Sequence, residues 1–247
     1  MDLTDLVTKT LDRRTRSGSS LRIAQAGHPA LRSRSRDGEA KLPTALLLEL
    51  VEAMTVTMRQ APGVGLAAPQ VGIPMRLFVM EDRIQDEETA EGGGVDGASQ
   101  DPQDPRHVDP LERGPVPLRV FLDPSYEVLE PSTGGHETVY AWEGCLSVDD
   151  WRSIVPRPRT ILFRGLEVGG LGEVTPVEEV HRGWPARILQ HETDHLAGIL
   201  CHDRAVPRSF VQSRYMDRYG EMPEAVRWLG LEGDVTRLGP GETTVRS

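Results

Sequence analysis

The sequence has few of the features that mark a secreted or membrane-spanning protein. Only two of its 247 residues are cysteine, so a disulfide framework is not expected. No apolar run approaches the ~20 residues needed to cross a bilayer. The first residues contain neither an apolar signal-peptide core nor a small-residue cleavage site. We therefore predict a cytoplasmic protein without a membrane partner.

Positive charge and aromatic side chains are also scarce. The chain has 28 basic and 38 acidic residues, a formal net charge of -10, and this balance argues against DNA as a partner. Aromatic residues make up 5% of the chain, whereas the apolar fraction of 38% is sufficient to bury a core. The length suits one domain with additions, or at most two domains.

Much of the acidity lies in one stretch, residues 81–117. It holds eleven acidic residues against three arginines, together with three consecutive glycines, several prolines and no aromatic residue. Such a composition buries too little apolar area to offset the entropy of ordering the chain. We predict that 81–117 is a disordered surface insertion.

Outside that stretch the pattern predicts an α+β fold. Leucine and methionine recur at three- and four-residue spacing over 45–60, which predicts an amphipathic helix. Proline and glycine separate the short apolar segments that follow, so we expect antiparallel strands joined by turns. Strands are predicted at 76–80, 118–122, 126–129, 137–142, 160–164 and 173–178. Residues 1–20 are predicted to be a flexible N-terminal lead that is frayed or weakly helical, and 207–247 a C-terminal helical tail.

The segment from Ile188 to Leu196 predicts a buried helix with a metal site. His191 and His195 are four residues apart, so on a helix they share one face and can bind one ion. Glu192 lies beside them, close enough to take a proton from an activated water. The alternative is a helix with two hydrogen-bonded histidines, because a catalytic metal also needs a third protein ligand and an open position.

Cys145, within the segment Glu-Gly-Cys-Leu-Ser, is a candidate for that third ligand. A thiolate suits a soft or borderline divalent metal, although a single cysteine is more often a small buried apolar residue. Cys201 is a rival candidate for this ligand, but it follows the helix with no motif around it, and we interpret it as structural.

A third segment, Gly-Val-Gly-Leu-Ala-Ala-Pro-Gln at 63–70, is rich in small residues. Small residues let another backbone approach closely, and the alternative is an ordinary turn that leads into a strand. It is not a phosphate-binding loop, because no Gly-Lys-Ser/Thr follows.

Together, 63–70, 143–147 and the Gln-His-Glu-Thr-Asp-His-Leu segment at 190–196 resemble the three motifs of the peptide deformylase family, in the family's order. The resemblance implies a catalytic domain at 21–206, with antiparallel sheets packed around a central metal-binding helix. It also implies an enzyme that removes the N-formyl group from the N-terminal methionine of newly synthesised proteins and releases formate. Its partners would be N-formylmethionyl nascent peptides and, transiently, the ribosome.

The resemblance assigns a role to each matching residue. Cys145, His191 and His195 would hold one divalent metal, Fe²⁺ in the family, which Zn²⁺, Ni²⁺ or Co²⁺ can replace, with water in the fourth position. Glu192 would accept the proton of this water and pass it to the leaving amine. The oxyanion would be stabilised by the Gln70 side-chain amide and the Leu146 backbone N–H.

The resemblance also implies where the substrate lies. The peptide would pair in extended form beside Gly63, Val64 and Gly65, and the methionine side chain would enter a pocket formed by Val64, Trp184 and Ile188. Two departures from the family pattern concern this region. Thr193 occupies a position that is usually apolar, and Val-Asp-Asp-Trp follows Ser147 where proline and glycine are expected.

Two other function classes fit parts of the pattern. A zinc peptidase or amidase of another specificity would take its third ligand from a downstream residue such as His202, but the longer glycine-containing signature is missing. A non-enzymatic protein that binds formylmethionine ends would be favoured if Glu192 or a ligand were absent, and all are present.

Overall fold

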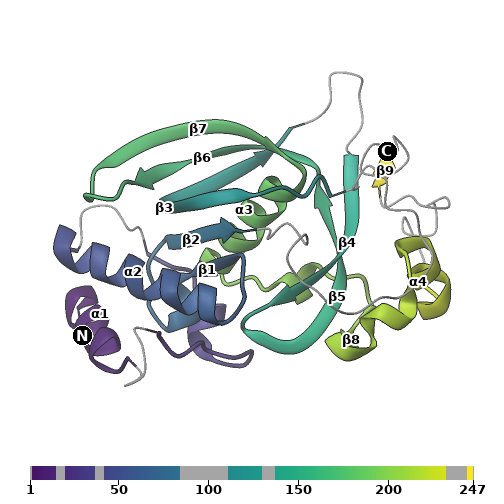
Figure 1. Ribbon diagram of the computed structural model, residues 1–247, viewed down its shortest axis with the longest axis horizontal. Helices are drawn as coiled ribbons and strands as arrows, with labels where there is room; N and C mark the ends of the chain where they lie inside the picture. Colours follow the sequence, from purple (N-terminus) through teal and green to yellow (C-terminus); the bar gives the residue numbers. More distant parts are fainter. Residues whose placement is uncertain are drawn as a thin grey trace, which may run out of the picture.

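Two antiparallel sheets and the helix α3 (Gly183–Leu196) form the centre of the computed structural model (Figure 1), which describes residues 2–14, 20–36, 42–83, 111–129 and 137–231 and the backbone of 244–246. The first sheet has the order β1 (Gly65–Ala67), β2 (Leu77–Asp82), β3 (Val116–Val128), β6 (Thr160–Val168) and β7 (Val174–Arg182). The second has the order β8 (Val211–Gln212), β5 (Val148–Pro158), β4 (Glu137–Cys145) and β9 (Thr244–Arg246). This arrangement confirms the α+β prediction and the antiparallel pairing.

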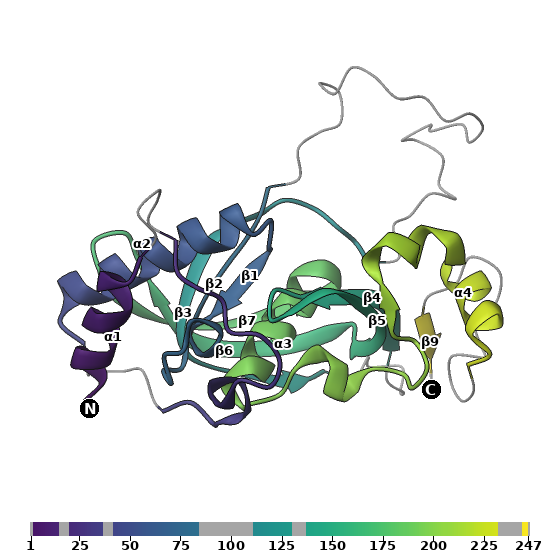
Figure 2. The ribbon, with the colours of Figure 1, turned by 90° about the horizontal axis from the view of Figure 1, so that it is seen from below.

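Helix α3 is joined to both sheets. On the first sheet it packs against a cluster of three phenylalanines, Phe78, Phe121 and Phe163, whose ring centroids are 4.9 to 6.4 Å apart. On the second sheet the Arg187 guanidinium donates to the Val139 carbonyl at 2.7 Å. Figure 2 shows α3 between the two groups of strands, so side chains on this helix can meet residues of both sheets.

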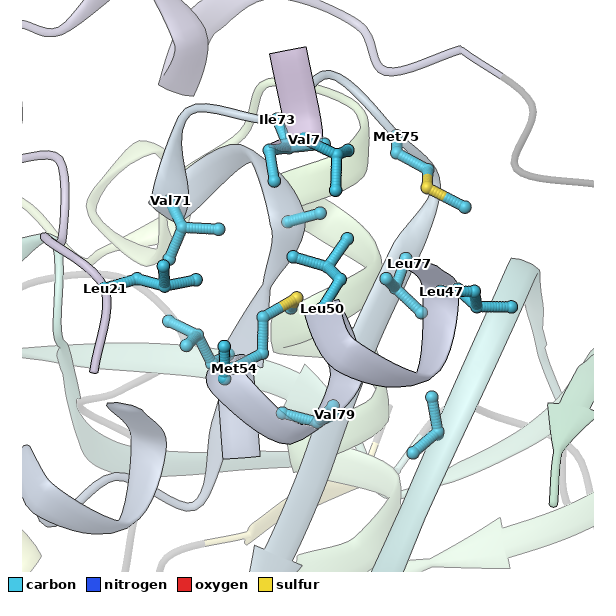
Figure 3. Close-up of a cluster of buried hydrophobic side chains, with 14 of the residues drawn as sticks. Val7, Leu21, Leu47, Leu50, Met54, Val71, Ile73, Met75, Leu77 and Val79 are labelled. Atoms are coloured by element: carbon cyan, nitrogen blue, oxygen red, sulfur yellow. The ribbon is translucent and has the colours of Figure 1, made fainter. Parts of the chain in front are cut away.

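The helix α2 (Thr44–Gln60) confirms the predicted helix at 45–60 and covers one side of the first sheet. Its apolar stripe, which includes Leu50 and Met54, is fully buried in a cluster that also contains side chains of β1 and β2 (Figure 3). The same cluster contains Val7 and Leu11 from the helix α1 (Leu3–Asp12).

Residues 3–12 of the predicted lead at 1–20 form a regular, docked helix and not a flexible or frayed segment. The Asp2 carboxylate caps α1 by accepting a hydrogen bond from the Asp5 N–H at 3.1 Å, and Val7 and Leu11 are buried against the core. Val7 and Leu11 are four residues apart, so they lie on one face of the helix, and this pair is enough to dock that face on the core. The many charged residues around them made this spacing hard to recognise in the sequence.

Leu11→Ala is expected to lower the free energy of unfolding by about 2–5 kcal/mol, because it leaves a cavity in a packed core. The matched control is Leu171→Ala, since Leu171 is 89% exposed and should change stability little. Urea denaturation of both variants checks this. Equal midpoints would show that α1 does not unfold together with the rest of the domain.

Strand β5 (Val148–Pro158) was not predicted, because its prolines argue against a central strand. The Ile154 N–H donates to the Ser209 hydroxyl at 2.9 Å and therefore points away from β4. Backbone direction alternates along a strand, so the nitrogens of Pro156 and Pro158 also point away from β4. The prolines therefore remove no hydrogen bond from the β4–β5 ladder.

Two other predicted segments have different bounds in the structure. The two strands predicted at 118–122 and 126–129 are one strand, β3, with an irregularity between Leu122 and Ser125. The predicted insertion at 81–117 is too long at both ends, because Asp82 and Val116 pair within the first sheet. The disorder predicted for its interior, 84–110, lies outside the described residues.

The tail at 207–247 is only partly helical. The strand β8 precedes a 3-10 helix, η5 (Ser213–Tyr219), and the helix α4 (Met222–Leu229), while the backbone of β9 pairs with β4. Short 3-10 helices also occur at Pro29–Arg32 (η1), Ala68–Val71 (η2) and Cys201–Arg204 (η4). No helix within the described ranges has the length and apolar character needed to cross a membrane.

Candidate metal centre and active site

The three predicted metal ligands come together at the junction of β4 and α3. Their ligand atoms, from Cys145, His191 and His195, all lie within 4.8 Å of one another. The Cys145 Sγ is 3.4 Å from the His195 Nε2. Tetrahedral ligands at usual zinc–sulfur and zinc–nitrogen distances lie ~3.6 Å apart, so the donor set fits one divalent ion. Cys145, His191 and His195 are a metal site.

A buried network of ion pairs lies next to the metal ligands and contacts His191. The Glu143 carboxylate lies 3.2 Å from the His191 Nδ1 and is paired with the guanidinium groups of Arg157, at 2.6 and 3.0 Å, and Arg187. Burial by itself would raise the pKa of Glu143, but the two arginines outweigh it and hold this pKa well below its usual value. A carboxylate that accepts the Nδ1–H leaves the Nε2 of His191 free for a metal.

The network continues along α3. Arg157 also donates to Asp194 at 3.0 Å, and Asp194 is paired with Arg204 at 2.7 Å and accepts the Tyr126 hydroxyl at 3.2 Å. Sequence reasoning missed these supporting residues. Glu143 and Asp194 lie within the motifs and could have been assigned a role, whereas Arg157 has no motif around it.

Glu192 lies on α3 between the two histidine ligands and is 3% exposed. Its Oε2 has no hydrogen-bond partner among the described residues. Burial raises the pKa of Glu192 to about 7. A carboxyl group in this state can exchange a proton near neutral pH.

Gln70 is held with its amide nitrogen near the metal ligands. The Gln70 Oε1 accepts the Ala67 N–H at 2.8 Å, and the Nε2 lies 3.2 Å from the Ser147 hydroxyl and 3.6 Å from the Cys145 sulfur. Because the oxygen is engaged by the backbone, the donor end of this amide faces the metal site. The structure therefore brings segment 63–70 into contact with segment 143–147.

A short segment at 24–26, which sequence reasoning did not single out, ties these motifs together. The Gln25 amide donates to the Leu146 carbonyl at 3.0 Å and accepts the Asp149 N–H at 3.3 Å. The Ala24 N–H donates to the Gln70 carbonyl, and the Ala26 N–H donates to the Ser147 carbonyl, both at 2.7 Å. These bonds hold the turn that carries Leu146 between β4 and β5.

The site opens into a cavity of about 660 Å³. Ten of the eleven predicted site residues line it, namely Gly63, Val64, Gly65, Gln70, Cys145, Leu146, Trp184, Ile188, His191 and Glu192. His195 is the exception, because it lies behind the cavity wall and is 1% exposed. The lining also includes Asp149 and Asp150, from the segment where the sequence departs from the family pattern, and the adjacent Arg152.

Strand β1 lies at the edge of its sheet, next to the cavity. The Glu81 N–H donates to the Val64 carbonyl at 3.0 Å, and the next pair in the register is Gly65 with Met80. Hydrogen-bonded and non-hydrogen-bonded pairs alternate in an antiparallel ladder. The N–H and carbonyl of Gly65 therefore face the open edge of the sheet.

Two residues considered as alternatives do not join the triad. His202 would be the third ligand of a zinc peptidase, but its Nδ1 is 3.2 Å from the Cys201 sulfur, and Cys145 completes the ligand set instead. Cys201 is 1% exposed, and burial raises the pKa of its thiol. The Cys201 sulfur lies near Glu143, whose two arginine partners oppose binding of a cation there.

The fold and this site define a metal-dependent hydrolase with its ligands on a His-Glu-x-x-His helix and a preceding strand. Residues 20–210 match the model of the polypeptide deformylase family. The chain belongs to the peptide deformylase family.

Individual relatives agree with this assignment. The chain is 40% identical over 212 residues to peptide deformylase 3 of Streptomyces avermitilis, covering 86% of this chain and 80% of that protein. The crystal structure of peptide deformylase from Thermotoga maritima superposes with a TM-score of 0.52 at 32% identity, covering 75% of this chain and 97% of that one. The Met-Ala-Ser-bound class I type b peptide deformylase of Acinetobacter baumannii gives a TM-score of 0.53 at 33% identity, covering 74% and 96%.

Proposed function

We propose that this chain hydrolyses the formyl amide at the N-terminus of nascent polypeptides and releases formate and a free methionine amino group. The observation that carries this proposal is the Cys145–His191–His195 site with Glu192 beside it, open to a cavity at the edge of β1. Family membership supports the choice of a formyl group over other acyl groups.

Cys145, His191 and His195 would hold the metal, and we propose Fe²⁺ as the native ion, with Zn²⁺, Ni²⁺ or Co²⁺ as substitutes. A thiolate with two imidazoles suits any of these borderline metals. When bound, the ion supplies Lewis acidity that lowers the pKa of water from ~15.7 toward ~7. The role of Glu143 is to hold the His191 ring in the tautomer that binds metal.

Glu192 accepts a proton from the attacking water and delivers it to the amine that leaves. Burial raises the pKa of Glu192, and a shift in this direction favours a carboxyl group that both accepts and returns a proton. The Gln70 Nε2–H and the Leu146 N–H donate to the oxyanion that develops on the formyl oxygen. Loss of one such donor typically lowers the rate ~100- to 1,000-fold.

The substrate peptide adds as a strand to the open edge of β1. Gly65 offers both its backbone N–H and its carbonyl there, so pairing needs no particular downstream sequence. The methionine side chain enters the cavity between Val64, Trp184 and Ile188. The relative that is bound to Met-Ala-Ser supports a peptide of this kind as the product.

Gly65→Ala is expected to lower kcat ~100-fold, because displacement of a catalytic group by ~1 Å can cost that much. A Cβ at Gly65 would overlap the Glu192 carboxylate and lie 2.7 Å from its Cγ. Gly170→Ala is the control, since a Cβ there would meet nothing within 4 Å. Steady-state kinetics with metal content checks this, and an unchanged kcat in Gly65→Ala would refute the placement of Glu192 as the proton carrier.

We further propose a cytoplasmic location with transient ribosome association, because the substrate is a chain still being synthesised. Co-sedimentation of the purified protein with translating ribosomes tests this. Equal recovery in the ribosome pellet and in a pellet prepared without ribosomes would contradict it.

The test of the reaction is formate release from formyl-Met-Ala-Ser by protein purified without oxygen, with metal measured on the same sample. We expect release with about one metal per chain, and loss of both in Cys145→Ala. We also expect activity to fall in air, because a thiolate at this position is open to oxidation. Bound metal without formate release would refute the proposed reaction.

A further inference from the structure

Two residues near the opposite ends of the acidic stretch 81–117, Asp82 and Arg113, contact Trp184 in the first turn of α3. The Trp184 Nε1–H donates to the Asp82 Oδ2 at 2.7 Å, and the Arg113 guanidinium carbon lies 4.7 Å from the centre of the indole ring. The sheet brings the two flanks together, because Asp82 at the end of β2 pairs with Val116 at the start of β3. The indole is thus held at its edge by a carboxylate and on its face by a cation.

Trp184 is also part of the cavity wall. It lines the cavity together with Val64, Ile188 and Arg113, and it packs against the buried cluster that contains Ile188. A hydrogen bond to a charged acceptor fixes the plane of the ring, and the cation restricts it further. Asp82 does not line the cavity, so it affects the cavity wall only through its hydrogen bond to the Trp184 indole.

We propose that Asp82 and Arg113 are positioning residues that fix Trp184 as a rigid wall of the methionine side-chain pocket and thereby set its selectivity against bulkier side chains. The inference rests on the proposed function, since it concerns the pocket of that substrate. A free indole could rotate and enlarge the pocket, whereas a fixed one excludes side chains wider than an unbranched thioether. Selectivity is then determined partly by residues that never contact the substrate.

The test compares Asp82→Ala with the wild type on formyl-Met-Ala-Ser and formyl-Phe-Ala-Ser. We expect the ratio of kcat/KM for the methionine over the phenylalanine peptide to fall ~10-fold, the lower end of what a change in an apolar pocket achieves. The change should appear in KM, with kcat for the methionine peptide within ~2-fold, because the metal site is untouched. Arg113→Ala should lower the ratio ~3-fold, as expected for a cation–π contact at an exposed site.

Four further variants, one of them a double variant, separate positioning from a general effect on the fold. Asp82→Asn keeps an oxygen acceptor for the indole and should retain the wild-type ratio. Arg83→Ala removes a neighbouring charge that pairs with Glu81 at 3.3 Å and should also retain it. In Trp184→Phe the indole N–H is gone, so adding Asp82→Ala should have no further effect on the ratio.

An active wild type with the same ratio in Asp82→Ala would overturn the inference alone. An equal fall when Asp82→Ala is added to Trp184→Phe would also overturn it, because the effect would not pass through the indole. Wild-type protein that releases no formate from either peptide would refute the proposed function, and this inference with it.

Discussion

Glu192→Ala is expected to lower kcat by ~100- to 10,000-fold while the metal stays bound, because positioned proton transfer contributes that much to a rate. Glu192 is not one of the three residues whose ligand atoms converge, so its removal leaves the donor set complete. The Glu192 Oε2 is buried without a hydrogen-bond partner among the described residues, so its removal should also leave the fold intact or slightly more stable.

Three measurements on the same sample check this prediction, namely formate release, metal content and thermal midpoint. Asp150→Ala is the matched control, since it removes another carboxylate of the cavity lining, one that is exposed and away from the ligands. We expect Asp150→Ala to lose much less activity. Substantial turnover in Glu192→Ala with a full complement of metal would show that another group carries the proton.

Arg157→Ala is expected to destabilise the fold by about 3–5 kcal/mol, because it leaves buried carboxylates with a missing partner. Arg157 is 1% exposed and donates to both Glu143 and Asp194. In this variant Glu143 is still paired with Arg187, and Asp194 is still paired with Arg204. We therefore expect the loss in free energy of unfolding to lie toward the lower end of this range. The metal affinity should also fall, by ~10- to 100-fold, because Glu143 orients His191.

Urea denaturation of the metal-free protein measures the first effect, and competition with a metal chelator measures the second. Arg164→Ala is the control, because Arg164 also pairs with two carboxylates, Glu127 at 2.8 Å and Glu178 at 2.7 Å, but on an exposed surface. Its denaturation midpoint should stay close to that of the wild type. Equal midpoints for the two variants would mean that the buried network contributes no more than a surface pair.

The chemistry of the site could be predicted because it depends on short local patterns. His191, Glu192 and His195 share a helix, and Cys145 was identified by its neighbours and by the resemblance. The segment around Gly65 was recognised in the same way. The structure adds the reason that glycine is needed at position 65, since a Cβ there would overlap the carboxylate of Glu192.

The residues that orient the metal ligands and Trp184 could not be predicted, because they act through contacts between residues far apart in the chain. Arg157 lies 14 residues from Glu143 and 37 from Asp194, and nothing near it marks it as buried. The same holds for Trp184, whose partner Asp82 is 102 residues away. A long-range ion pair or hydrogen bond has no periodicity in the sequence, so only the folded chain reveals it.

The bounds of helices and strands were also predictable where they depend on local sequence patterns, and not where they depend on long-range contacts. The apolar period of α2 predicted that helix almost to the residue, because the hydrophobic stripe is local. Strand β5 was missed because its prolines are acceptable only where their nitrogens face away from β4, and that depends on the neighbouring strand. The docking of helix α1 was not predicted, because Val7 and Leu11 become a core face only when α2 lies beside them.

The sequence by itself therefore determined the α+β class, the ligands of the metal, the candidate proton carrier and the family, since each is encoded in spacing or in a short motif. The tertiary structure alone decided how the Glu143–Arg157–Asp194 network supports the ligands, how segment 24–26 joins two motifs, and how Asp82 and Arg113 hold Trp184. The physical reason is that charge pairing and packing act through space, whereas spacing and propensity act along the chain.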